Sequence, residues 1–337
     1  MRRHVPLFVL AIGFAGCTVL TATAASSNYR VVKRYPIGGS DTGYDYVHLD
    51  AESRQLFVAH GNRVEVLDAD SGTKRGEISG MHGVHGIEII PGTSIGFTSN
   101  GLDRSVTKFD AKTLQPIKVI KYLGLKPDAL QYDPDTQKLY VVNGGGTGDV
   151  TVIEPKTGAI VATVELNGGK LEEIAFDGAG RAFVNDEERS VVHVFDTHTL
   201  KPLAVWSLSP GEAPTGMAID APHHRLFSAC GNNKLVVLDT GTGKVVATPS
   251  IGSDPDGAAY DASSGRIFTS NYDGTLSVLH EDSPDHYALL QTVKTEPGAR
   301  TLAVDGKTGS VFLPTAKKAA DGRAIVPDTF VVLVVAQ

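Results

Sequence analysis

Ionisable side chains recur at one position of a repeated sequence pattern. Five residues before the end of each expected innermost strand, the chain has Asp45, His85, Asp128, Glu172, Thr215, Asp256 and Arg300. If these positions converge, they form a binding site for a small molecule or a protein partner. Carboxylates and imidazole also coordinate divalent cations such as Ca²⁺, Mg²⁺ or Zn²⁺. The candidate metal ligands are Asp45, His85, Glu88, Asp128, Glu172 and Asp256.

Two histidines and one arginine are candidates for catalysis at the same place. In the stretch MHGVHGIE (81–88), an extended chain points His82 and His85 to opposite sides, so we expect His85 to face the interior. His48 also points inward if the alternation of the first strand holds. Either His85 or His48 could act as a general base, and Arg300 could stabilise a developing anion. The alternative is that these polar side chains simply line a wet channel opening, and the sequence leaves both interpretations open.

Polar residues also end the second strand of each repeat. They are His60, Asn100, Asn143, Asp186, Cys230, Asn271 and Thr315. We expect the asparagines to be turn residues that tolerate a positive φ. His60 and Cys230 depart from that pattern and could face a ligand. Cys230 is otherwise expected to be a small buried apolar residue.

The elements that position these residues come from a sevenfold repeat. Short apolar runs such as LFVAH, GFTSN, LYVVN and IFTSN each carry one aromatic residue. These aromatic residues are Phe57, Phe97, Tyr140, Phe183, Phe227, Phe268 and Phe312, spaced 40 to 44 residues apart. Each copy contains four β-branched segments bounded by turn residues. A four-stranded unit of this length, repeated radially, predicts an all-β fold, a seven-bladed β-propeller of four-stranded blades.

The two ends of the chain are expected to close the ring. The seventh copy stops after its third strand, FVVLVV, whereas YRVVKRYPI (29–37) precedes the first copy. This segment should therefore supply the fourth strand of the last blade. We expect a single propeller domain over residues 25–337.

The start of the chain is typical of an exported protein. Arg2 and Arg3 precede an apolar run and the small-residue site Ala22-Thr23-Ala24, which predicts a signal peptide over residues 1–24. An alternative is a lipid anchor at Cys17, since FAGC resembles a bacterial lipoprotein box. We therefore expect a periplasmic or secreted protein, or one tethered through Cys17, with no transmembrane segment.

The overall charge argues against one class of partner. The chain has 31 Lys and Arg against 38 Asp and Glu, a net charge of −7. Because nucleic-acid binding needs a basic face, no nucleic acid is expected. We expect a monomer.

The runs LYVVN, IFTSN and GFTSN, each followed by a hairpin such as VIEPKTG or VLDTGTG, resemble the YVTN-repeat (YncE-like) propeller family. The resemblance covers nearly all of the chain after the expected signal peptide and implies an exported propeller with a binding role. Propellers of the gluconolactonase and streptogramin-lyase groups are similar in design, with a divalent cation held by acids at the rim. This similarity implies the alternative, a metal-dependent lactonase-like hydrolase or lyase.

Overall fold

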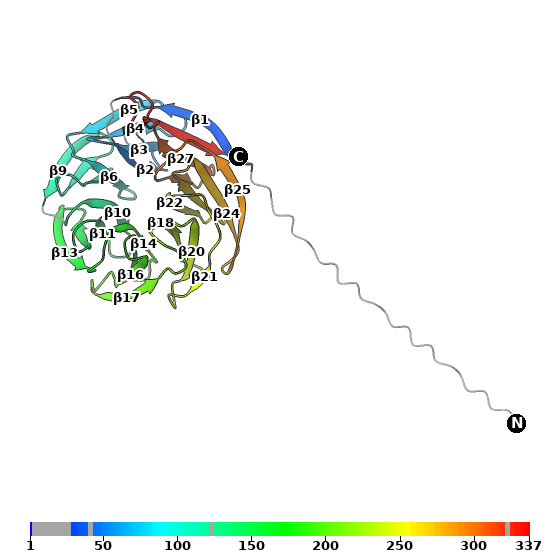
Figure 1. Ribbon diagram of the computed structural model, residues 1–337. Coiled ribbons are helices and arrows are strands. Elements are labelled where there is room, and N and C mark those ends of the chain that lie inside the picture. Colours follow the sequence, from blue (N-terminus) through cyan, green and yellow to red (C-terminus); the bar gives the residue numbers. More distant parts are fainter. Residues whose placement is uncertain (2–27, 40–42, 122–123, 321–323) are drawn as a thin grey trace.

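The computed structural model describes residue 1 and residues 28–39, 43–121, 124–320 and 324–337. The expected signal peptide and the alternative anchor at Cys17 lie outside this part, apart from residue 1. The described residues form seven four-stranded antiparallel sheets arranged in a ring (Figure 1), so the prediction of a seven-bladed β-propeller is confirmed. Within these ranges, no helix has the length and apolarity that a bilayer span requires.

Each blade runs from an innermost strand at the channel to an outermost strand at the perimeter (Figure 1). The innermost strands are β2 (Tyr44–Asp50), β6 (Val84–Ile89), β10 (Pro127–Asp133), β14 (Leu171–Phe176), β18 (Pro214–Asp220), β22 (Pro255–Asp261) and β26 (Ala303–Asp305). The second strands are β3 (Gln55–His60), β7 (Ile95–Asn100), β11 (Lys138–Asn143), β15 (Arg181–Asp186), β19 (Arg225–Cys230), β23 (Arg266–Asn271) and β27 (Ser310–Thr315).

The outer half of each blade is less regular in length. The third strands are β4 (Arg63–Asp68), β8 (Ser105–Asp110), β12 (Asp149–Glu154), β16 (Val191–Asp196), β20 (Lys234–Asp239), β24 (Thr275–Ser283) and β28 (Val331–Ala336). The outermost strands are β5 (Lys74–Ser79), β9 (Gln115–Lys121), β13 (Ala159–Glu165), β17 (Pro202–Ser207), β21 (Val245–Ala247), β25 (His286–Lys294) and β1 (Arg30–Pro36).

The repeated aromatic residues pack the blades against one another. Among the described residues, the buried apolar side chains form seven clusters, one at each junction between neighbouring blades. Every cluster or its immediate lining receives one of the seven repeated aromatic side chains, and all seven are at most 1% exposed. Burying an aromatic side chain of this size contributes about 2–3 kcal/mol. The regular spacing of the aromatic residues in the sequence therefore reflects the same hydrophobic contact between blades, repeated seven times.

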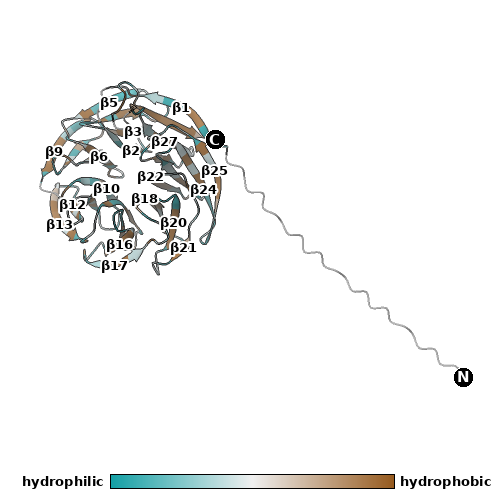
Figure 2. Cartoon of the chain, viewed as in Figure 1, coloured by the Kyte–Doolittle hydropathy of each residue, from teal (hydrophilic) through white to brown (hydrophobic). Residues whose placement is uncertain are grey.

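The perimeter keeps apolar side chains in solvent. Strands β9, β13 and β17 each expose large aliphatic side chains, and Figure 2 shows brown segments along β9 and β13. An outermost strand pairs with a neighbouring strand on one side only. The exposure of its side chains therefore follows from its place at the edge of the sheet.

Acidic residues at the ends of the third strands fix the outer hairpins. Asp68 accepts a hydrogen bond from the backbone N–H of Ser71 at 2.8 Å, and Asp196 accepts one from Thr199 at 2.6 Å. Asp side chains stabilise turns in this way. These acids therefore have a structural role in the outer hairpins.

The first strand of the chain closes the ring, as predicted. β1 pairs antiparallel with β28, from Arg30 opposite Ala336 to Pro36 opposite Val331. Tyr35 of β1 is buried, and its hydroxyl donates to the carbonyl oxygens of Ala69 and Asp70 at 3.0 Å. The closing strand thus contacts both the last blade and the first.

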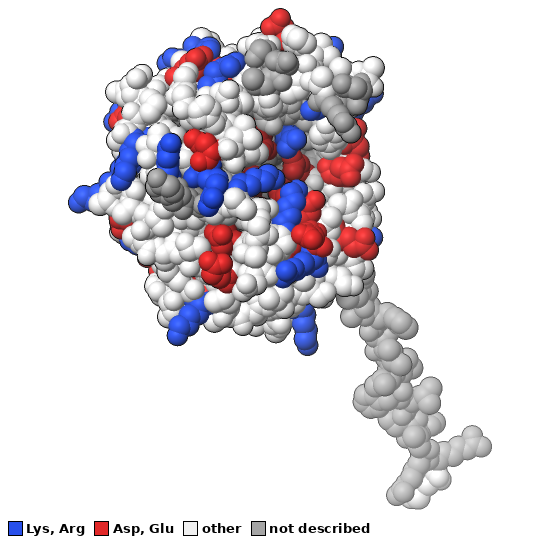
Figure 3. Space-filling view, turned by 60° about the vertical axis from the view of Figure 1, so that its left-hand side comes forward, with Lys and Arg blue, Asp and Glu red and all other residues white. Residues whose placement is uncertain are grey.

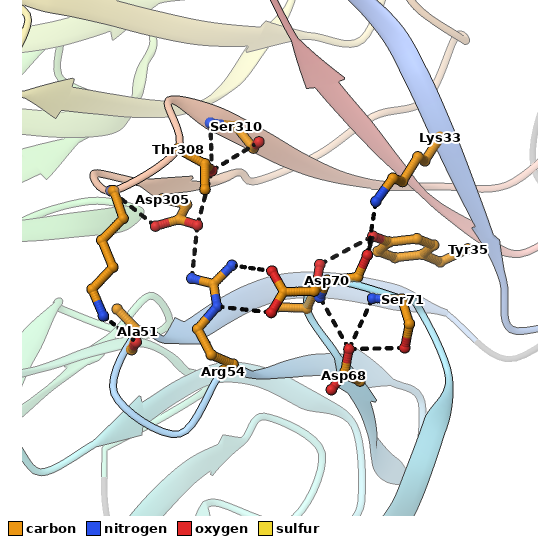
Figure 4. Close-up of polar contacts among 12 residues, drawn as sticks. Lys33, Tyr35, Ala51, Arg54, Asp68, Asp70, Ser71, Asp305, Thr308 and Ser310 are labelled. Carbon is orange, nitrogen blue, oxygen red and sulfur yellow. Dashed lines mark hydrogen bonds and ion pairs between the residues drawn. The ribbon is translucent and has the colours of Figure 1, made fainter.

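An arginine strengthens the same junction (Figure 4). The guanidinium of Arg54 in the first blade binds both carboxylate oxygens of Asp70, at 2.6 and 3.2 Å. Its Nη1 also donates to the buried Asp305 of the last blade at 2.7 Å. Such a planar, two-pronged pairing is stronger than a single ion pair. Two blades that are far apart in sequence are joined by one side chain.

We expect Tyr35→Ala to destabilise the propeller by about 3–5 kcal/mol, because the substitution leaves a cavity at the closing junction and removes two hydrogen bonds. Chemical unfolding by urea measures the change. Val32→Ala is the control on the same strand, because the Val32 side chain is 40% exposed. Equal midpoints for the two variants would contradict the role assigned to β1.

Candidate functional site

The seven side chains that the repeat selects line a single cavity on the channel axis. This rim cavity has a volume of about 90 Å³, and its lining includes Asp45, His85, Asp128, Glu172, Thr215, Asp256 and Arg300. Six of them are the second residue of an innermost strand, and Arg300 lies just before β26. The structure therefore brings together every member of the predicted binding set.

A β-bulge places these side chains at the rim. Six innermost strands gain one residue relative to their partner strand at this point; in β10, for example, the register shifts between Pro127 and Leu130. A bulge redirects side chains locally. In three blades a glycine follows (Gly86, Gly216 and Gly257), because the innermost strands approach closely there: a Cβ at Gly216 would lie 2.5 Å from the backbone of Gly257 and Ala258.

Opposite charges alternate around the cavity. His85 Nδ1 lies 2.5 Å from Asp45 Oδ2 and 3.7 Å from Asp128 Oδ1. Arg300 Nη1 lies 3.7 Å from Asp45 and 3.8 Å from Asp256. Asp45 and Asp128 are buried, so water only weakly screens the interactions of their carboxylates with the neighbouring charges.

Two lysines in the same cavity were missed by the sequence analysis. Lys126 Nζ lies 3.5 Å from Asp128, and Lys170 Nζ lies 2.6 Å from Glu172 and also contacts Glu187. Each lysine precedes its acid by two residues, a spacing that places side chains on the same face of an extended chain. The same alternation, followed two residues toward the N-terminus from Asp128 and Glu172, predicts both lysines. Mixed charge also marks the outer surface, where Lys and Arg lie beside Asp and Glu on the face seen in Figure 3.

Crowding and burial favour the protonated forms of the rim acids. Burial, reinforced by the charge of Asp128, raises the pKa of Glu172 to about 9 against the opposing charge of Lys170. Burial and then the charge of Asp45 raise the pKa of Asp256 to about 6. A bound cation would lower both values by favouring the ionised carboxylates.

His85 responds in the opposite sense to burial. Burial lowers the pKa of His85, but the hydrogen bond to Asp45 and the charges of Asp128 and Asp45 outweigh it, so the pKa is raised overall. The raised pKa means that the two aspartates favour the positively charged form of the imidazole.

Three of the rim residues have the spacing of metal ligands. One ligand atom each from Asp45, His85 and Asp128 lies within 4.8 Å of the others. Two carboxylates and an imidazole suit Zn²⁺, while Ca²⁺ and Mg²⁺ would use mainly the carboxylate oxygens. The donor set fits a divalent cation at this point.

The structure separates His48 and Glu88 from the other candidates. They lie further along the channel, in a second cavity of about 310 Å³ that Gln131 and Glu173 also line. His48 Nδ1 lies 3.6 Å from Glu88 Oε2. Burial lowers the pKa of His48 to about 4 and raises that of Glu88 to about 8. Burial also raises the pKa of Glu173 to about 7.

The positive φ expected for the asparagines at the ends of the second strands was wrong, whereas the burial expected for Cys230 is confirmed. Asn100, Asn143 and Asn271 have no positive φ; their buried side chains donate to hydroxyl oxygens of the third strand, as from Asn271 to Ser277 at 3.0 Å. His60 is fully buried and contacts Glu65 at 3.1 Å, so it does not face a ligand. Cys230 is also fully buried, and burial raises the pKa of its thiol to about 12. The asparagines and His60 therefore bind the third strand of their own blade.

The raised pKa of Glu88 predicts a stability that depends on pH. Neutral Glu88 favours the folded state below pH 4.5, and this contribution is lost as the pH rises toward the folded pKa of about 8. Glu88→Gln mimics the neutral form. Relative to wild type, the variant should therefore gain about 2–4 kcal/mol in unfolding free energy between pH 5 and pH 9.

Urea unfolding at both pH values tests this prediction. Glu77→Gln is the control: Glu77 is exposed, and the hydrogen bond from Lys74 lowers its pKa, so its replacement should bring no gain at high pH. An unchanged difference between Glu88→Gln and wild type at the two pH values would contradict the prediction.

Comparison with known proteins agrees with this architecture. Residues 132–334 match the family model described as Outer membrane protein assembly factor BamB. The uncharacterized protein YncE of Escherichia coli K12 is 26% identical over 169 residues, which is 46% of this chain and 47% of the relative. YncE of Salmonella typhi is 26% identical over 235 residues, 66% of this chain and 60% of the relative. The aligned segments thus span about half to three fifths of these curated relatives.

Solved structures share the fold at low sequence identity. The structure of U3-55K has a TM-score of 0.75 and 12% identity, covering 91% of this chain and 98% of that one. A chain of the Mitotic Checkpoint Complex has a TM-score of 0.74 and 14% identity, covering 99% and 100%. At these identities the likeness concerns the fold alone. With the family match over more than half of its length, the chain belongs to the BamB family of β-propellers, and it is also similar to YncE.

Proposed function

We propose that this protein is an exported binding protein that holds a small charged ligand in the rim cavity. The observation that carries the proposal is the convergence of one side chain from every blade on a single enclosed point. Sites on rigid folds are commonly built from loops and strand ends in this way. The expected signal peptide and the name of the matched family support a location at the cell envelope.

The size of the rim cavity limits what can occupy its centre. A cavity of about 90 Å³ can hold an ion with a few water molecules, because a cavity needs only about 10–15 Å³ to hold one water. Two larger hollows flank it, of about 370 and 380 Å³, and Arg300 lines all three. We therefore infer a divalent cation, or the charged head of a small molecule, at the centre, with any larger body of the ligand in a flanking hollow.

A second candidate is a metal-dependent lactonase-like hydrolase or lyase. It is favoured by the cluster of Asp45, His85 and Asp128, which could hold the cation, while Arg300 is placed to stabilise an anion. His48 is too far along the channel to act as general base at this point, since it lines the other cavity. His85 cannot bind the cation and act as base through the same nitrogen, so the catalytic alternative needs a base that the cluster does not supply.

Asp128→Asn should weaken binding of a divalent cation at the rim by at least tenfold, because it removes one of three charged or imidazole ligands. Isothermal titration of the chelator-treated full chain with Ca²⁺, Mg²⁺ and Zn²⁺ measures the change. Glu212→Gln is the matched control, an exposed acid outside the cavity. Equal affinities of wild type and Asp128→Asn for all three cations would count against a cation at the rim.

The catalytic alternative is tested with the same protein samples. Cation-dependent hydrolysis of simple aliphatic lactones, lost in His85→Ala, would support catalysis. Cation binding without any turnover supports the binding protein.

A further inference from the structure

The hairpin between the first and second strands carries a second repeated interaction, on the face of the propeller opposite the rim cavity. In four blades, the last residue of the first strand is an Asp that accepts a backbone N–H from two residues on and a hydroxyl from three residues on. These pairs are Asp50 with Ser53, Asp133 with Thr136, Asp261 with Ser264 and Asp305 with Thr308. The interaction is local and needs no ligand.

The fifth blade keeps the Asp but lacks both the backbone N–H and the hydroxyl group that bind it in the other four blades. Two residues after Asp220 stands Pro222, which has no N–H to donate. Three residues after it stands His223 in place of Ser or Thr, with its Nδ1 2.5 Å from Asp220 Oδ2. Asp220 is buried, whereas the His223 side chain is 57% exposed. A metal-ligating side chain therefore occupies the position where the other four blades have a hydroxyl.

The neighbouring blade supplies a third ligand. β24 and β25 of the sixth blade have nine residues each, and β24 extends past the point where five of the other third strands end in an acid. This extension carries Glu281, whose Oε1 accepts a hydrogen bond from Tyr287 at 3.1 Å. The other oxygen, Oε2, is enclosed and has no hydrogen-bond partner of regular geometry among the described residues. The nearby Tyr260 hydroxyl interacts with the same carboxylate. One ligand atom each from Asp220, His223 and Glu281 lies within 4.8 Å of the others.

We propose that Asp220, His223 and Glu281 form a binding site for a divalent transition cation of the Zn²⁺ type, which joins the fifth blade to the sixth. Two carboxylates balance the charge of the cation, and an imidazole favours Zn²⁺ over Ca²⁺ or Mg²⁺. Tetrahedral ligand atoms lie about 3.3 Å apart when each bond is about 2.0 Å. His223 must therefore move away from Asp220 by less than about 1 Å, which its exposure allows.

The burial of the two acids favours the same occupant. Burial and the neighbouring Asp220 raise the pKa of Glu281, so the pair is costly to ionise together without a cation. Tyr260 of the sixth blade also reaches the cluster, since its hydroxyl lies 3.3 Å from Asp220 Oδ2. A bound cation would bridge residues from both blades and stabilise the junction between them.

The test uses the chelator-treated full chain carrying His85→Ala and Asp128→Asn, so that the rim cavity does not contribute a cation. Isothermal titration with ZnCl₂ should show one bound equivalent and a rise in melting temperature. Adding His223→Ser should weaken binding by at least tenfold and abolish the rise. This variant restores the residue type found in the other blades, so it should fold. Glu281→Gln should weaken binding in the same way.

His198→Ser in the same background is the matched control. His198 is exposed to a similar extent and pairs with a single acid, Asp135, at 2.9 Å. It should leave zinc binding unchanged. Absence of a bound equivalent in the background chain, or equal affinity in the His223→Ser variant, would overturn the proposal. Because the rim is disabled in every sample, neither result bears on the proposed function of the rim cavity.

Discussion

The closing contact between β1 and β28 is the constraint on which the rest of the structure depends. Without it, the last blade would lack its outermost strand, and Tyr35 and Arg54 would lose their partners in the first and last blades. A ring distributes its hydrophobic contacts over seven equivalent junctions, but each junction holds its angle only while the circle is closed. The rim cavity exists because the starts of the innermost strands are held at one axis.

That geometry explains the unusual electrostatics of the channel. Residues that are far apart in sequence are forced within a few ångströms of one another, and the surrounding blades exclude most of the water. The chain responds partly by interspersing Lys126, Lys170 and Arg300 among the acids, and partly by favouring protonated carboxyls such as Glu172. Further along the channel, no lysine or arginine among the described residues lines the second cavity. There, burial is the largest cause of the raised pKa values of Glu88 and Glu173. The rim thus balances its charges by pairing, and the inner channel by protonation.

Much of this arrangement could be predicted from sequence, because residues at equivalent positions of the repeat lie at equivalent places around the ring. Phe57 and its six counterparts gave the number of blades, and the unpaired FVVLVV strand gave the closure. The same alignment selected Asp45 and its counterparts correctly as neighbours. It failed where depth along the channel mattered: His48 and His85 both point inward, yet they line different cavities. The prediction was also wrong for Asn143 and the other second-strand asparagines. It rested on turn propensity, whereas these side chains form buried hydrogen bonds to the third strand. Lys126 and Lys170 were missed because only one register position was compared.

The origin of the closing strand has a consequence for how the protein is made. The partner of β1 is β28, which follows six complete blades in the sequence, so β1 must wait while these blades are synthesised. At roughly 5–20 residues per second, that delay lasts tens of seconds. Throughout this time the edge of β1 is available to other strands, and the finished circle cannot assemble on a partly translated chain. The last tertiary contact of the ring therefore forms only after both β1 and β28 have been released and lie in the same compartment.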